Sequence, residues 1–233
     1  MAKQASIVSV IQGEISGWWQ FYLRHRYGVL FYSLLLTLVG EPILKAFGSS
    51  GDLLEMFVGL NLMAAALPFD DRKQHWALPA VLVVAVALRI GSLQVGHAVL
   101  SSASLVLWAG IALYAVFVML RLVLRSPAVT LEHLYAALSA YMMAGVFLGV
   151  LYWTFEEIQP GSIIVNGEAV AHPFSLAKGI YFSFITLATV GYGDVVPGND
   201  VVRGLSIVEA IAGQFYLAVM IARLMSLYIR DKR

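Results

Sequence analysis

The stretch Thr189–Asp194 reads TVGYGD and is the most informative part of this 233-residue sequence. Its two glycines, Gly191 and Gly193, allow backbone conformations that are closed to other residues. Residues alternating around them can aim successive backbone carbonyl oxygens at one axis. Four such segments around an axis would form stacked rings of oxygens, which can replace the hydration shell of a large monovalent cation.

An apolar segment, Phe174–Ala188, comes directly before this stretch. It is shorter than the roughly 20 residues that a membrane-spanning helix needs. We interpret it as a re-entrant half-helix, because irregular backbone at membrane depth is tolerated only inside protein or beside a water-filled cavity. Its C-terminal end, the negative end of the helix dipole, would favour a cation near the bilayer centre.

The composition excludes several classes of protein. Only 12% of the residues are charged, 60% are hydrophobic, and the mean hydropathy is +0.81, which together indicate an integral membrane protein. A net charge of +1 is too small for a nucleic-acid binder. The absence of cysteine excludes disulfides, thiol catalysis and zinc–thiolate sites.

The apolar segments predict an all-α membrane protein with six transmembrane helices, in which the re-entrant helix and the TVGYGD stretch lie between helices five and six. The expected spans are Tyr27–Phe47, Leu53–Phe69, Trp76–Gly96, Ala98–Leu120, Leu134–Phe155 and Gly204–Ala222. Most of the 15 Lys and Arg residues then fall on the side that carries both termini. By the positive-inside rule, we expect both termini to be cytoplasmic in a multi-pass protein of the plasma or inner membrane.

We expect three regions along the chain. Residues 1–26 would form an interfacial segment anchored by aromatic residues, residues 27–125 a four-helix transmembrane domain, and residues 126–233 a domain containing the TVGYGD stretch. Within the last region, Ile163–Val170 predicts a β-hairpin, because Asn166-Gly167 is a strong hairpin-turn signal.

The stretch Thr189–Asp194 matches the selectivity filter of potassium channels, and Leu131–Tyr228 resembles their pore region of outer helix, turret, pore helix, filter and inner helix. The resemblance implies a potassium-selective channel rather than an enzyme, with no cofactor beyond the permeant K⁺. K⁺ would bind the backbone carbonyls of Thr189, Val190, Gly191 and Tyr192, with the Thr189 hydroxyl, and Gly193 would complete the filter. A single filter per chain implies a homotetramer, in which each chain binds three further copies of itself and the lipid bilayer.

The resemblance also assigns supporting roles around the filter. Tyr192 would pack behind it, and Tyr181 on the pore helix would hydrogen-bond Asp194, the alternative being that Tyr181 only packs. Glu209 is an intramembrane carboxylic acid and therefore a candidate functional group. It would either hydrogen-bond the pore helix through Thr186 or Ser183, or line the cavity and concentrate cations.

The inner helix carries two further candidates. Gly213 lies where the family often has a hinge, although a small residue for close helix packing is an equal alternative. Ala218, Ile221, Ala222 and Met225 could line the inner mouth, where an apolar constriction would gate by dewetting.

The first four spans resemble a voltage-sensor domain without its arginine repeat. The fourth, Ala98–Leu120, contains no charged residue, so we expect weak or absent voltage sensing. Arg89 in the third span should form an ion pair with Glu41 or Glu55, because an unpaired charge there would be costly.

Other functions remain as alternatives. A voltage-gated potassium channel and a non-selective cation channel share this architecture, although the latter usually alters the position of Tyr192. The Gly-x-Gly-Asp string at Gly191–Asp194 also fits intramembrane aspartyl proteases. That chemistry needs a second aspartate at membrane depth, and every other aspartate lies outside the expected spans.

Overall fold

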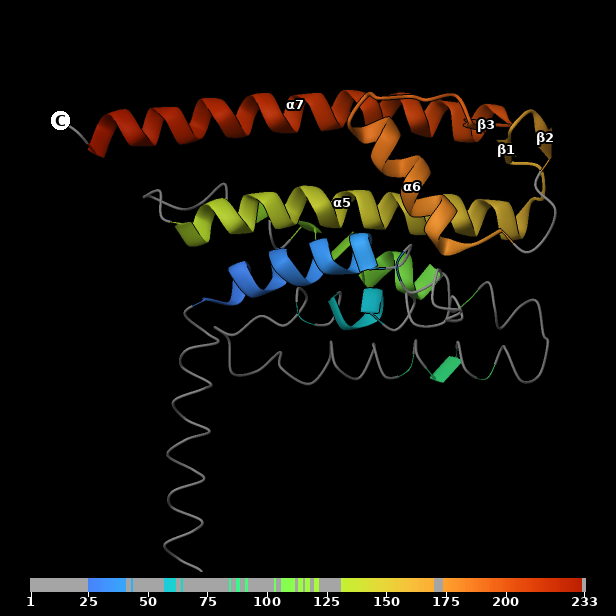
Figure 1. Ribbon diagram of the computed structural model, residues 1–233, viewed down its shortest axis with the longest axis horizontal. Helices are drawn as coiled ribbons and strands as arrows, with labels where there is room; N and C mark the ends of the chain where they lie inside the picture. Colours follow the sequence, from blue (N-terminus) through green and yellow to red (C-terminus); the bar gives the residue numbers. More distant parts are fainter. Residues whose placement is uncertain are drawn as a thin grey trace, which may run out of the picture.

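The computed structural model describes residues 25–40, 131–169 and 174–231, together with scattered helical positions between residues 43 and 121. Three helices and a small sheet make up the second half of the chain (Figure 1). The helices are α5 (Leu131–Ile158), α6 (Leu176–Leu187) and α7 (Asp200–Asp231), and the strands are β1 (Ile163–Val165), β2 (Glu168–Ala169) and β3 (Val195–Pro197).

Within the described residues, α5 and α7 are the two helices long and apolar enough to cross a membrane. They contain the fifth and sixth expected spans and extend beyond both ends of each. The other four expected spans fall on residues that are described only in pieces. Residues 25–40, inside which the first span begins, are helical. The total of six spans and the division at residues 26 and 125 therefore stay predictions.

Helix α6 runs obliquely between α5 and α7 (Figure 1). Its N-terminus is capped by Ser175, whose side chain accepts a 3.4 Å hydrogen bond from the backbone N–H of Lys178. Glycines let α5 and α6 approach closely, because a Cβ at Gly179 would lie 2.6 Å from the carbonyl oxygen of Gly149. The 12-residue α6 matches the expected half-helix, and its position within a bilayer stays a prediction.

The hairpin predicted from Asn166-Gly167 is present up to Ala169. Strands β1 and β2 pair antiparallel, and both turn residues have positive φ, +51° and +82°, as a type I′ turn requires. The prediction missed β3, which pairs antiparallel with the other edge of β1 to give the order β2-β1-β3. The described residues are thus mostly helical, as expected, and this small sheet joins the segment after TVGYGD to the hairpin.

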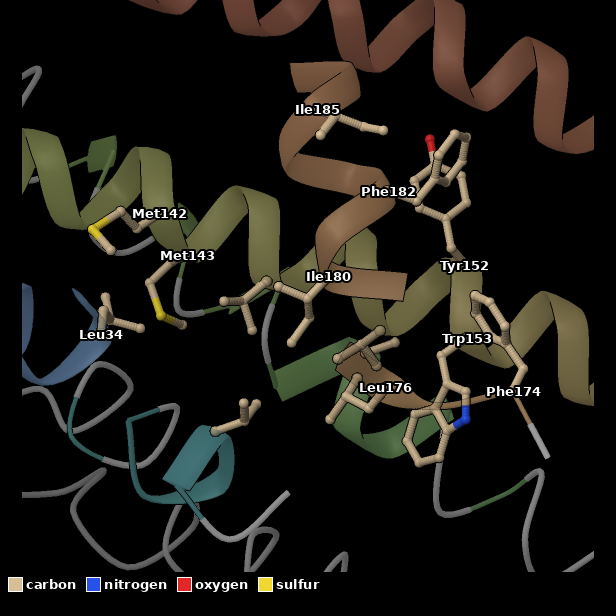
Figure 2. Packing of buried hydrophobic residues seen from close by; sticks show 14 of the residues in the cluster. Leu34, Met142, Met143, Tyr152, Trp153, Phe174, Leu176, Ile180, Phe182 and Ile185 are labelled. Atoms are coloured by element: carbon tan, nitrogen blue, oxygen red, sulfur yellow. The ribbon is translucent and has the colours of Figure 1, made fainter. Parts of the chain in front are cut away.

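The core lies where α5 and α6 meet (Figure 2). The rings of Tyr152 and Phe182 pack edge to face, with centroids 4.6 Å apart. Residues 25–40 pack on α5 through Tyr27, whose N–H donates to Glu132 over 3.3 Å and whose carbonyl accepts from Ser139 over 3.5 Å. These contacts attach the N-terminal part of the chain to the first half of α5.

Candidate functional site

The backbone after α6 alternates in handedness. Thr189, Gly191 and Gly193 have φ of +56°, +54° and +82°, whereas Val190 and Tyr192 between them have ordinary negative φ. Alternation between right- and left-handed residues turns successive N–H groups to one side of the chain. The amides of Val190 and Gly191 accordingly both donate to the carbonyl of Ile185 on α6, over 2.8 and 3.1 Å.

Because those N–H groups face back toward α6, the carbonyls of the same peptide units point the opposite way. Residues 189–193 are all exposed in the single chain, Val190 at 49% and Tyr192 at 73%. The carbonyls of Thr189 and Val190 therefore face away from α6, and the alignment of all the carbonyls in this stretch stays a prediction. Packing of Tyr192 behind the filter is not achieved within one chain, so it would require a second copy.

Two contacts hold the outer end of this segment. The Tyr181 hydroxyl donates to Asp194 Oδ2 over 2.8 Å, which is the hydrogen bond expected from the sequence. The carbonyl of Asp194 accepts from the N–H of Asn166 in the hairpin turn, over 2.8 Å. The end of the segment is thereby tied both to α6 and to the sheet.

A buried carboxylate joins the three helices. Glu209 on α7 is 1% exposed. Its Oε1 accepts from Ser183 on α6 over 2.6 Å, and its Oε2 accepts from Tyr152 on α5 over 2.5 Å. Of the two pore-helix partners considered, Ser183 is confirmed and Thr186 is wrong, because the Thr186 hydroxyl donates to the Phe182 carbonyl instead. The burial of Glu209 also contradicts the alternative in which it lines the cavity.

The C-terminal end of α6 is held from both sides. The hydroxyl of Tyr141 on α5 donates to the Leu187 carbonyl over 3.3 Å. On the other side, Gly213 of α7 lies so close that a Cβ there would collide with the same carbonyl oxygen. Helix α7 runs without interruption through Gly213. The structure therefore supports close packing as the reason for this glycine.

Helix α7 presents different residues on different faces. One face turns toward α5 and α6 and carries Glu209, Gly213, Tyr216 and Met220. The candidates for the inner mouth, Ala218, Ile221, Ala222 and Met225, are exposed. Gln214 shares their face, and its Nε2 donates to the Thr189 hydroxyl over 3.4 Å. The sequence analysis missed Gln214, although its spacing of four residues from Ala218 would have placed it on that face.

Buried Glu156 supports the small sheet, a role that was not predicted from the sequence. Its carboxylate accepts from the N–H groups of Gly161 and Ile163, over 2.9 and 2.8 Å, and so attaches the sheet to the end of α5. The expected ion pair of Arg89 with Glu41 or Glu55 lies outside the described residues.

Comparison with known proteins locates the similarity in the same region. Residues 128–230 match a family model described as Ion channel. Two pore potassium channel c of Oryza sativa subsp. japonica is 31% identical over 105 residues, which are 45% of this chain and 20% of that protein. Two-pore potassium channel 3 of Arabidopsis thaliana is 29% identical over 97 residues, 42% of this chain and 19% of that protein.

A third relative, potassium channel subfamily K member 16 of Mus musculus, is 39% identical over 56 residues, 21% of this chain and 19% of that protein. The chain thus spans about a fifth of the length of these curated relatives. No solved structure matches it significantly.

Proposed function

We propose that this chain, in which residues 128–230 match a family model described as Ion channel and part of the chain is similar to two-pore potassium channels, forms a pore for passive, selective K⁺ permeation. The observation that carries the proposal is the orientation of the first peptide units of this segment. The N–H groups of Val190 and Gly191 donate to the Ile185 carbonyl on α6, so the Thr189 and Val190 carbonyls of the same peptide units face away from α6, and residues 189–193 are exposed. Rings of such carbonyls can replace the hydration shell of K⁺.

The pore is a homotetramer in this proposal. Each chain contributes one such segment, and a ring of oxygens needs several segments around one axis. Helix α7 supports association, because only 17% of its apolar stretch is buried within the chain, against 56% for α5. Its exposed apolar residues would contact neighbouring chains and lipid. They include Val201, Ile207, Val208, Ile211, Phe215 and Val219.

The proposal also covers the setting of the pore. The chain lies in the plasma or inner membrane with both termini in the cytoplasm, as the distribution of Lys and Arg indicates. Permeation is passive and requires no cofactor. The C-terminal end of α6 points toward the start of the carbonyl segment at Thr189, where the negative end of its dipole favours a cation.

Replacing Gly191 with alanine tests the function directly. A side chain at φ +54° disfavours the left-handed conformation by about 1–2 kcal/mol per chain, so the alignment of carbonyls should be lost. We expect the wild-type protein in liposomes to pass K⁺ and exclude Na⁺, and Gly191→Ala to lose that discrimination. The measurement is tracer flux of each ion.

The matched control is Gly167→Ala, which places the same strain, at φ +82°, in the hairpin turn outside the filter. It should retain the wild-type preference for K⁺. Equal K⁺ and Na⁺ fluxes through the wild-type protein would instead favour the non-selective cation channel. Proteolysis that is lost in Asp194→Asn would favour the aspartyl protease, although in this structure Asp194 is held by Tyr181.

Opening of the pore should depend little on voltage. Moving one elementary charge through the field is worth about 2.3 kcal/mol per 100 mV, and the fourth expected span, Ala98–Leu120, contains no charge to move. We expect open probability in a planar bilayer to change only weakly between −100 and +100 mV steps, a range of about 200 mV. A steep sigmoidal dependence would identify a voltage-gated channel instead.

A further inference from the structure

Between Gln214 and Met225, one exposed face of α7 contains a single polar residue. Gln214, Ala218, Ile221 and Met225 follow one another at spacings of four, three and four residues, which places them on one side of a helix. All four side chains are exposed in the single chain. Three are apolar, so the amide of Gln214 is the polar group at the filter end of this stripe.

The contact of Gln214 with Thr189 shows which way the stripe faces. Gln214 Nε2 donates to Thr189 Oγ1 over 3.4 Å. Thr189 begins the carbonyl segment at the point where α6 ends. The stripe therefore continues from the inner end of the filter along the rest of α7, and Gln214 lies at the junction between the filter and the space below it.

The chemistry of the two side chains is complementary to a cation. A threonine hydroxyl has two acceptor lone pairs and one O–H donor. Donation from Gln214 occupies one lone pair and restricts rotation of the hydroxyl, leaving the second lone pair for an ion. The amide also carries its own carbonyl oxygen on the same carbon as the nitrogen, so four chains would bring four further oxygens beside the Thr189 hydroxyls.

We propose that Gln214 is an ion-binding residue, whose amide completes the cation site beside the Thr189 hydroxyl at the inner entrance of the filter. This inference rests on the proposed function, because it needs four chains around a conducting axis. A cation bound at this site gives up its hydration water and gains oxygen ligands from the protein. The site governs how tightly ions and blockers bind from the inner side, whereas the backbone carbonyl rings govern the choice of K⁺ over Na⁺.

The test uses Ba²⁺, which has nearly the radius of K⁺ and twice its charge and therefore binds oxygen sites of this size more tightly. The reconstituted full-length protein is recorded in planar bilayers with Ba²⁺ applied to each side in turn. Gln214→Met keeps the length of the side chain and removes both polar groups. When Ba²⁺ is applied from the side of the inner cavity, its block should weaken about tenfold, because each chain loses a hydrogen bond at the ion site.

Gln159→Met is the matched control, because it makes the same substitution at an exposed position in the outer loop after α5. Ba²⁺ should block this variant as strongly as it blocks the wild type, from either side. Gln214→Glu provides a second variant, in which a carboxylate replaces the amide at nearly equal volume. Its negative charge should strengthen Ba²⁺ block from the same side, and this result also supports the site if Gln214→Met fails to assemble.

The outcomes separate the inference from the function on which it rests. A wild-type protein that passes K⁺ selectively, with Ba²⁺ block unchanged in both Gln214 variants, would refute the ion site and leave the channel intact. Altered block in Gln214→Met together with a lost preference for K⁺ over Na⁺ would also contradict it, because the carbonyl rings would then have been disturbed. A wild-type protein that passes no ions would overturn the proposed function first.

Discussion

Glu209→Ala is expected to destabilise the assembled protein by about 3 kcal/mol per chain, because it leaves the buried hydroxyls of Ser183 and Tyr152 without their acceptor. The carboxylate joins α5, α6 and α7, so its removal should loosen α6 and the segment Thr189–Gly193 that follows it. We expect a large drop in the temperature at which the detergent-solubilised protein loses its helical circular dichroism.

Two further variants distinguish hydrogen bonding from mere volume. Glu209→Gln keeps the shape and one acceptor oxygen, so it should cost only about 1 kcal/mol. Adding Tyr152→Phe to Glu209→Ala should recover part of the loss, because the second substitution removes a buried hydroxyl that has lost its carboxylate acceptor and keeps only its contact with Ser206. Glu157→Ala on the exposed side of α5 is the control and should leave the transition almost unchanged. Equal effects of Glu157→Ala and Glu209→Ala would contradict the proposed role.

Much of the local structure could be predicted because it depends on local chemistry. The apolar segment Phe174–Ala188 predicted a half-helix where α6 lies, and Asn166-Gly167 specifies a type I′ turn through the positive φ of both residues. The hydrogen bond between Tyr181 and Asp194 followed from the family resemblance. In each case the residues that determine the feature are close together in the sequence.

The missed features depend on contacts between distant segments. Strand β3 pairs with β1 although the paired residues, from Val165 with Val195 to Ile163 with Pro197, are far apart in the sequence, and a three-residue strand has no pattern of its own to reveal it. The partner of Glu209 on α5 was missed for the same reason, because nothing near Tyr152 in the sequence marks its hydroxyl as buried. Gln214 was missed because the stripe was described by its apolar members, although the helical period also includes this residue.

Gly213→Ala gives the other large expected effect. A methyl group at this position would collide with the carbonyl oxygen of Leu187, and a backbone atom at the end of α6 cannot move aside as a flexible side chain can. Forcing such an atom into a packed contact costs about 1–3 kcal/mol. This exceeds the gain of roughly 1 kcal/mol that alanine brings over glycine inside a helix. We expect a lower thermal transition and, if the proposed function holds, a weakened preference for K⁺, since α6 leads directly into the proposed filter at Thr189.

Gly204→Ala is the matched control, because Gly204 lies on the same helix and a Cβ there meets nothing within 4 Å. Alanine at this position should raise the transition slightly through helix propensity alone. The pair also separates the two roles considered for Gly213. If its role were to bend the helix, alanine would stiffen α7 at no steric cost, so both variants would be stabilised and only Gly213→Ala would open less often. If the role of Gly213 is instead its close contact with Leu187, the two substitutions should change stability in opposite directions. The same methyl group enters open space at Gly204 but meets the packed backbone of α6 at Gly213.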